Sequence, residues 1–212
     1  MKLLFVTATN TDIGKTYASL QLIEAFAKEK IKVGVCKPIE TGVVDFPIDA
    51  TKLLSKVQHY NSEFLSLKPK DITAYTFALP SAPFCADKDG VIEIEKIKQK
   101  ITQLSKLCDL LIVEGAGGLM VPITKDYMMI DLAKDLNATV LLITPSHLGC
   151  INDTILSIEM LKSREIDFHW CVNLFKDRDK FKETTQPFYD KAFPNWWILQ
   201  KDLSLFVKKF II

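Results

Sequence analysis

Short runs of apolar residues alternate along this chain with longer segments whose apolar residues repeat at helical spacing. The apolar runs predict buried strands over residues 3–6, 32–36, 110–113, 140–143 and 170–175. The segments with helical spacing predict helices over residues 16–28, 50–57, 94–108, 130–136, 151–162, 181–193 and 203–210. Strands that alternate with helices need crossover connections, which make the strands parallel and cover both faces of the sheet. We therefore predict a single α/β domain over residues 1–212, built on a parallel sheet with helices on both faces.

The long loops of this predicted fold lie at residues 37–48 and 66–90, which carry many Pro, Gly and polar residues. Long loops in a compact α/β domain are usually functional. Ligands of such sheets bind outside the carboxyl ends of the strands. The residues that follow each predicted strand are therefore the first candidates for a functional site.

Composition narrows the function classes. The chain has 27 Lys plus Arg and 26 Asp plus Glu, a formal net charge of +1, which argues against binding nucleic acid through net charge. Its apolar runs are too short to span a bilayer, and Thr7 and Thr9 come too early for a signal peptide. The five cysteines are scattered without a C-x-x-C pair, so we expect no disulfide framework or zinc site. A cytoplasmic protein without membrane or nucleic-acid partners is the expectation.

The segment after the first predicted strand has the pattern of a phosphate-binding loop. Residues 8–16 end in Gly14, Lys15 and Thr16 and open directly into a helix. Backbone N–H groups and the helix N-terminus of such a loop surround anionic oxygens, while the Lys reaches the β- and γ-phosphates and the Thr hydroxyl binds Mg²⁺. A strict Walker spacing needs Gly where this chain has Thr9. The alternative is an ordinary strand–turn–helix with a chance triplet, and the flanking elements favour the phosphate loop.

Charged residues also follow the second and third predicted strands. Lys37, held by Pro38 at the strand exit, could direct an ammonium at the same phosphates or be a surface lysine. Asp45 and Asp49 could each bind Mg²⁺ or cap the next helix. Glu114 begins a segment of small residues, 114–118, which suits a second acidic metal position or a plain glycine-rich turn.

The fourth predicted strand leads into a helix whose first residues could bind an anion. Residues 146–153 open this helix, and its free N–H groups make either an anion site or an ordinary cap. Four such signals at successive strand ends are hard to assign to chance.

Taken together, these residues make the chain similar to the dethiobiotin synthetases, the ATP-dependent cyclo-ligases of biotin biosynthesis. The phosphate loop of that family, G-T-D-T-x-x-G-K-T, is one residue longer than a Walker loop and corresponds to residues 8–16, with Ala8 in place of the usual Gly and Asn10 in place of the usual Asp. The other matching motifs are K-P-x-x-[ST]-G at 37–42, Y-x-F-x-x-P-x-x-P at 75–83, E-G-A-G-G at 114–118 and L-G-x-[IL]-N at 148–152. The Gly-x-x-Pro element that helps hold the adenine in the family is missing from residues 194–203.

The resemblance implies a P-loop NTPase-like fold and a Mg²⁺-dependent reaction of 7,8-diaminopelargonate, CO₂ or bicarbonate, and ATP or another nucleoside triphosphate. It implies a catalytic role for Thr11, Lys15 and Lys37. The nucleotide-binding residues it implies are Asp12, Ile13, Gly14, Lys15, Thr16, Tyr17, Asp49, Glu114, Gly115, Ala116, Gly117 and Asn173. Of these, Thr16, Asp49 and Glu114 are the implied metal ligands. The implied substrate-binding residues are Thr41, Gly149, Cys150, Ile151, Asn152 and Tyr189, with the substrate site shared across a homodimer.

Two other function classes remain open. One is a partitioning-type P-loop ATPase, a dimeric switch that carries a second Lys early in the loop, where this chain has Thr9, Asn10 and Thr11. The other is a nucleotide-binding interaction module without catalysis. The joint presence of Lys15 and Lys37 with Glu114 argues against the module.

Overall fold

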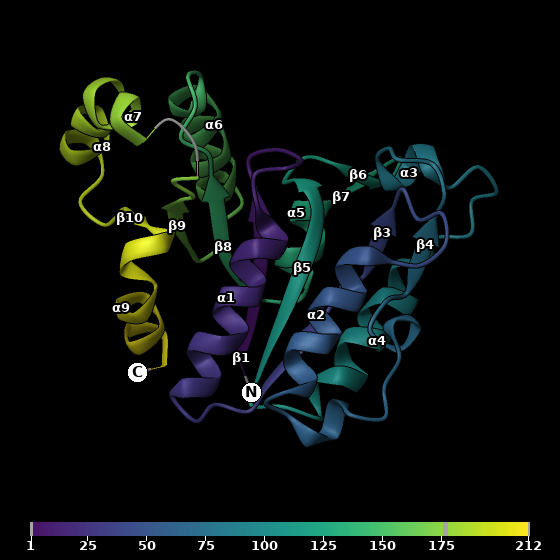
Figure 1. Ribbon diagram of the computed structural model, residues 1–212. Helices are drawn as coiled ribbons and strands as arrows, with labels where there is room; N and C mark the ends of the chain where they lie inside the picture. Colours follow the sequence, from purple (N-terminus) through teal and green to yellow (C-terminus); the bar gives the residue numbers. More distant parts are fainter. Residues whose placement is uncertain (1, 176–177, 212) are drawn as a thin grey trace.

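The structure, a computed structural model, describes residues 2–175 and 178–211. Its centre is a six-stranded sheet, entirely parallel, in the order β10-β9-β8-β1-β5-β2 (Figure 1). The strands are β1 (Lys2–Ala8), β2 (Val33–Cys36), β5 (Leu110–Gly118), β8 (Thr139–Thr144), β9 (Phe168–Val172) and β10 (Trp197–Ile198). Because β1 is central, the segment that follows it emerges in the middle of the carboxyl edge of the sheet.

Helices cover both faces of this sheet (Figure 1). The larger helices are α1 (Lys15–Lys28), α2 (Ile48–Gln58), α4 (Ile94–Ser105), α5 (Met129–Asp135), α6 (Cys150–Ser163) and α9 (Leu199–Ile211). Helix α1 packs between α2 and α9 on one face, and α4 and α5 lie on the other. Buried apolar side chains from the sheet and from both helical layers form one continuous core cluster.

Short elements complete the fold. The pair β3 (Ile39–Thr41) and β4 (Tyr75–Phe77) is parallel, and the pair β6 (Pro122–Thr124) and β7 (Tyr127–Met128) is antiparallel. The short helices are α3 (Pro83–Ala86), α7 (Arg178–Thr184) and α8 (Gln186–Ala192), with 3₁₀ turns η1 (Ser62–Phe64) and η2 (Pro69–Asp71).

The predicted α/β architecture is confirmed, and the differences have local causes. The predicted helix over 181–193 is two helices, α7 and α8, because Pro187 cannot continue the hydrogen bonding of a helix and restarts one as an early residue. The predicted strand over 110–113 extends to Gly118, since β5 stays paired with β1 as far as Ala8. Part of the predicted loop over 37–48 is the strand β3.

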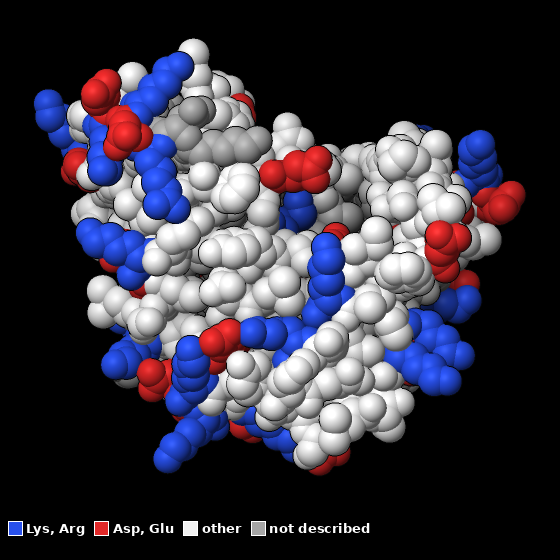
Figure 2. All heavy atoms as spheres, viewed as in Figure 1, with Lys and Arg blue, Asp and Glu red and all other residues white. Residues whose placement is uncertain are grey.

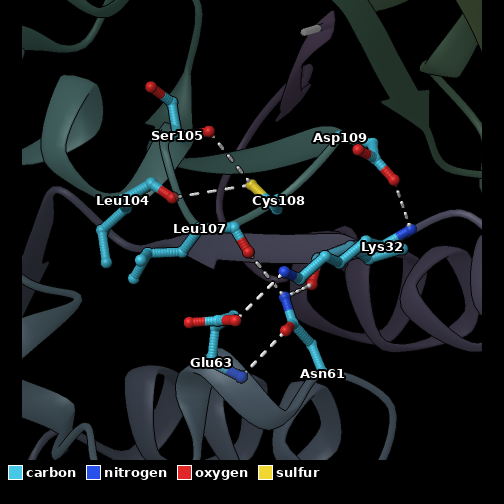
Figure 3. Close-up of polar contacts among 9 residues, drawn as sticks. Lys32, Asn61, Glu63, Leu104, Ser105, Leu107, Cys108 and Asp109 are labelled. Carbon is cyan, nitrogen blue, oxygen red and sulfur yellow. Dashed lines mark hydrogen bonds and ion pairs between the residues drawn. The ribbon is translucent and has the colours of Figure 1, made fainter.

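A group of side chains ties together the amino end of the sheet (Figure 3). We call it the amino-end cluster and define it as Lys32, Asn61, Glu63, Cys108 and Asp109. The side-chain amide of Asn61 donates to the carbonyl oxygens of Val33 (2.9 Å) and Leu107 (3.1 Å), and its oxygen accepts from the Glu63 N–H at 3.1 Å. Asn61 is only 2% exposed, so one side chain fixes three chain segments at this end.

Candidate active site

A cleft of about 750 Å³ lies at the carboxyl end of the sheet. Figure 2 shows a recess at the upper edge of the molecule where acidic and basic side chains lie close together. The lining residues come from four segments: Thr11, Asp12, Gly14, Lys15 and Thr16; Lys37, Ile39, Glu40, Thr41, Gly42 and Asp49; Pro80, Ser81, Ala82 and Pro83; and Ala116, Gly117 and Val121. Residues predicted from four separate motifs therefore meet in one cavity.

The phosphate loop reaches α1 through two residues in the left-handed region, Asp12 (φ 59°) and Gly14 (φ 99°). Gly14 immediately precedes α1 and has no side chain to cap it, which leaves the helix N-terminus facing the cleft. The Lys15 ammonium folds back on the loop and donates to the carbonyl of Asn10 at 3.1 Å. Burial, together with the nearby Lys37, lowers the pKa of Lys15 to about 8, so an incoming anion would meet a poorly neutralised cation.

Glycines of β5 let this loop pack against the sheet. A Cβ on Gly118 would lie 2.9 Å from the carbonyl oxygen of Thr9. Gly117 has a φ of 64°, and a Cβ there would lie 2.7 Å from the Val121 side chain. The small residues after Glu114 therefore serve the approach of the loop, although they belong to β5 rather than to a turn.

A charge network joins the end of β2 to β5 and α2 beneath the loop. The Lys37 ammonium donates to Glu114 Oε1 at 2.9 Å and to the Gly115 carbonyl at 3.0 Å, and lies 3.9 Å from Asp49 Oδ2. Burial opposes the charge on Lys37, but the carboxylates of Glu114 and Asp49 outweigh it and raise the pKa of Lys37. Lys37 is therefore a buried, charged member of the cleft rather than a surface lysine.

Glu114 also holds a side chain in the first turn of α1. The Thr16 hydroxyl donates to Glu114 Oε1 at 2.9 Å. The other oxygen, Oε2, is buried and has no hydrogen-bond partner among the described residues. A buried, unpaired carboxylate oxygen is unfavourable unless a ligand completes it. Thr16, Glu114 and Asp49 are hard oxygen donors, and they fit a Mg²⁺ ion that takes its remaining ligands from phosphates and water.

Glu40 lines the cleft and caps α2, which the sequence did not reveal. Its two carboxylate oxygens accept from the backbone N–H groups of Asp49 (2.8 Å) and Ala50 (2.9 Å), so Glu40 caps α2 from a distance of nine residues. Burial raises the pKa of Glu40, against the opposing effect of these two backbone hydrogen bonds. Because Glu40 supplies the cap, the Asp49 carboxylate is released from that role and faces Lys37. Asp45, the other candidate, is exposed and does not line the cleft.

Asn173 lies directly behind the phosphate loop. Its side-chain amide donates to the Ile13 carbonyl at 2.8 Å, and its nitrogen occupies the space where a Cβ of Gly14 would lie, 2.3 Å away. Gln200 of α9 donates to the Asn173 side-chain oxygen. Tyr17, one turn into α1, is 45% exposed beside this group. The C-terminal segment, which lacks the Gly-x-x-Pro element, thus reaches the loop indirectly, because Gln200 contacts Asn173 and Asn173 contacts the loop.

The residues predicted to bind the substrate carboxylate lie outside the cleft of their own chain. Gly149 (φ 97°) precedes α6, Cys150 is buried, and Asn152 is exposed with its amide 3.3 Å from Asp153 Oδ1. Ile151 is half-buried on the same turn. None of these residues lines the cleft described above.

Tyr189 is fully buried in an aromatic cluster with Trp170, Phe181 and Phe193. Its hydroxyl lies 2.9 Å from Thr154 Oγ1. In this structure the Tyr189 side chain therefore supports α6 from within, and it presents no surface to a ligand.

A parallel sheet whose central strand leads through a Gly-Lys-Thr loop into a helix defines a P-loop nucleotide-binding protein. A family model described as an AAA domain matches residues 2–173. A plasmid partition protein from Borrelia burgdorferi shares the fold, with a TM-score of 0.62 at 10% identity, covering 99% of this chain and 97% of that one. The MinC:MinD cell division complex of Aquifex aeolicus gives a TM-score of 0.56 at 18% identity, covering 99% of this chain and 86% of that one.

Sequence relatives narrow the class to one family. The ATP-dependent dethiobiotin synthetase BioD of Sulfurovum sp. is 56% identical over 98% of this chain and 99% of its own length. The protein of the same name from Wolinella succinogenes is 34% identical over 96% of this chain and 95% of its own. The chain belongs to the dethiobiotin synthetase family, as the motif resemblance implied.

Proposed function

We propose that this chain is an ATP-dependent ligase that converts 7,8-diaminopelargonate and CO₂ into the cyclic urea dethiobiotin. The observation that carries the proposal is the meeting of Lys15, Lys37 and Glu114 at one cleft with a phosphate loop. Two lysines at one nucleotide site suit a reaction in which a second anion meets the γ-phosphate. Membership of the dethiobiotin synthetase family supplies the identity of that anion, a carbamate.

The proposed reaction has three steps. One amine of the substrate adds to CO₂ and loses a proton, which gives the carbamate. A carbamate oxygen attacks the γ-phosphorus, the bond to the β-phosphate oxygen breaks, and ADP leaves. The second amine then attacks the carbonyl carbon of the resulting carbamic–phosphoric anhydride, and phosphate leaves as the ring closes.

The chain's own residues divide this work. Lys15 and the N–H groups at the start of α1 hold the β- and γ-phosphates and stabilise charge on the moving oxygens. Lys37, fixed at the bottom of the cleft, faces both the γ-phosphate and the carbamate. Thr11 and Thr41 lie on the cleft wall and hold the carbamate by hydrogen bonds.

We also infer a Mg²⁺ ion held by Thr16, Asp49 and Glu114. Such an ion would supply charge neutralisation between the phosphates. The unpaired Glu114 Oε2 supports this assignment, as does the cap from Glu40, which leaves the Asp49 carboxylate available.

A homodimer that shares its substrate site is a further part of the proposal. Asn152 and the N-terminus of α6 stand apart from the cleft of their own chain, and Leu148 (82% exposed) and Leu156 (62% exposed) flank them. Exposed leucines of this kind suit an interface between two copies. In the dimer, Asn152 of one subunit would bind the carboxylate of a substrate held by Lys37 of the other.

We place the enzyme in the cytoplasm, without membrane or nucleic-acid partners. All five cysteines are free thiols, which suits a reducing compartment. No helix among the described residues has the length and apolar character needed to cross a membrane.

The decisive experiment measures product rather than ATP loss alone. Dethiobiotin should form, with one phosphate released per ring, only when diaminopelargonate, bicarbonate, ATP and Mg²⁺ are all present. Mixtures of Lys37→Ala and Asn152→Ala chains should recover activity through hybrid dimers with one intact site. A rate of ATP hydrolysis that does not depend on diaminopelargonate would instead support the partitioning-type switch. No recovered activity in mixtures that exchange subunits would rule out the shared site.

A further inference from the structure

The structure assigns Gln200, at the start of the last helix, as a positioning residue that orients the phosphate loop through Asn173. Four groups form a single hydrogen-bonded chain: the Leu174 N–H, the Gln200 amide, the Asn173 amide and the Ile13 carbonyl. We call this chain the amide relay. It links Gln200 to Asn173, 27 positions earlier in the chain, and links Asn173 to the phosphate loop near the start of the sequence.

The direction of the relay is fixed by its two backbone ends. The Leu174 N–H can only donate, so the Gln200 oxygen must accept from it, at 3.0 Å. The Gln200 nitrogen must then donate to the Asn173 oxygen, which turns the Asn173 nitrogen toward Ile13. The Ile13 carbonyl can only accept, and it does so at 2.8 Å. Flipping either amide would place two donors or two acceptors against each other.

This direction has a consequence for the nucleotide site. In a trans peptide the C=O and the following N–H point in opposite directions. Because Asn173 holds the Ile13 carbonyl behind the loop, the N–H of the same peptide, which belongs to Gly14, points forward. Gly14 lines the cleft, so this N–H is aimed where a phosphate would lie.

Two further contacts make Asn173 a rigid support. Its backbone N–H donates to the Thr144 carbonyl at 2.8 Å, which anchors it to the end of β8. A Cβ on Gly14 would lie 2.3 Å from its side-chain nitrogen, so a larger residue at position 14 would displace Asn173. Asn173 is 8% exposed, whereas Gln200 is exposed, so Gln200 can be replaced without opening the core.

The inference deepens the proposed function, because it concerns how the same site binds the phosphates of its nucleotide. Its test uses inorganic tripolyphosphate as the probe and measures the Kd by calorimetry, without diaminopelargonate. Gln200→Leu removes the relay without adding charge and should weaken tripolyphosphate binding about fivefold, the scale of one lost hydrogen bond. Asn173→Ala should weaken it at least as much. Lys201→Met, one residue further along α9, is a matched control that loses more charge than Gln200→Leu and should bind more tightly than that variant.

The double variant decides whether the residues act as one unit. If Gln200 acts through Asn173, adding Gln200→Leu to Asn173→Ala should change the Kd by less than about twofold. Gln200→Leu also loses two hydrogen bonds of the folded state, so its urea midpoint is measured to show that the variant stays fully folded under the binding conditions, which separates loop orientation from general loss of stability. Fully additive effects, or wild-type binding by Gln200→Leu, would overturn the inference. Normal tripolyphosphate binding by a chain that forms no dethiobiotin would count against the proposed function alone.

Discussion

The two ends of the central sheet treat buried polar groups in opposite ways. At the amino end, Asn61 satisfies three backbone groups of neighbouring segments and has both ends of its amide paired. At the carboxyl end, Glu114 Oε2 and the Thr7 and Thr9 hydroxyls are buried without partners among the described residues. The pKa of Lys15 is lowered at the same end, chiefly by burial. Buried polar groups without partners lower the stability of the fold. Their presence at the carboxyl end indicates that ligand binding, rather than folding, shaped the sequence there.

The difference between the two ends predicts how substitutions at each end should affect stability and turnover. Changes at the amino end should lower the free energy of unfolding and leave turnover intact, because nothing there touches the cleft. Changes to the poorly paired groups at the carboxyl end, which are Lys15 and the buried oxygens without partners, should instead leave the free energy of unfolding unchanged or higher, because these groups contribute little to the empty protein. Where such a group contacts the ligand, turnover should fall.

The largest expected effect follows from Lys15→Ala. It removes a cation at the transferring phosphate, and such contacts are worth about 3 kcal/mol or more at the transition state, so kcat should fall by more than about a hundredfold. The free energy of unfolding should stay the same or rise, since a buried ammonium with a lowered pKa is unfavourable in the empty site. Steady-state dethiobiotin formation and urea unfolding measure the two quantities. Lys52→Ala, at an exposed position of α2, is the matched control; a kcat for Lys15→Ala within tenfold of the wild type would remove Lys15 from the mechanism.

Asn61→Ala should have the opposite signature. It breaks three buried hydrogen bonds at about 1 kcal/mol each, so the free energy of unfolding should fall by about 2–3 kcal/mol. The kcat measured on folded protein should not change, because Asn61 lies at the far end of the sheet from the cleft. Asn195→Ala, at an exposed position, controls for loss of an amide. A reduced kcat with an unchanged free energy of unfolding would contradict the proposed difference between the two ends.

The sequence predicted most of the carboxyl end, because the chemistry there is local. Gly14, Lys15 and Thr16 form a contiguous motif, and Lys37 and Glu114 each follow a clear apolar run, so their meeting at one edge follows from parallel strand topology. The helices and the main strands were predictable for the same reason, since periodicity records burial directly.

What the sequence could not predict depends on contacts between distant segments. Glu40 caps α2 from nine residues away, and Gln200 of α9 donates to Asn173 at the end of β9. Neither Glu40 nor Gln200 is a fixed residue of a motif or part of a periodic apolar pattern. The short strand β3 pairs only with β4, and its three residues give too little alternation to recognise. Tyr189 was implied as a substrate contact by the family resemblance alone, and its complete burial depends on contacts with α6 and distant aromatic residues that no local pattern records.

Thr7→Val should stabilise the fold, because it removes an unpaired polar group at the carboxyl end of the sheet. The Thr7 side chain is fully buried in β1, and its hydroxyl has no partner among the residues that the structure describes. Valine has the same shape, so the substitution should raise the free energy of unfolding by about 1 kcal/mol. Thr144→Val on the adjacent strand is the matched control: its hydroxyl lies 2.6 Å from Thr154 Oγ1, and its loss should be destabilising. Equal effects of the two substitutions in urea unfolding would contradict the argument.

The smallest expected effect concerns His169, which lies at the start of β9 and so belongs to the amino end. Its ring meets those of Phe206 and Phe210 on α9 at centroid distances of 5.3 and 6.2 Å. The residue is exposed as a whole, but partial burial of its ring lowers the pKa of His169 below its usual value of 6.5, and the carboxylate of Asp167 opposes the shift only in part.

A histidine whose pKa is lower in the folded state binds protons more tightly when unfolded. Its contribution to stability is therefore complete above the unfolded pKa and is lost as the pH falls through 6.5 toward the folded pKa. The urea midpoint of the wild type should drop between pH 7.5 and 5.5 by more than that of His169→Leu, which has no proton to bind at this position. Phe210→Ala, which removes one of the two rings packed against the histidine, should show a drop between those of the other two proteins. Identical drops in all three would show that α9 does not shield His169, and that the amino end carries no pH-sensitive contact at this helix.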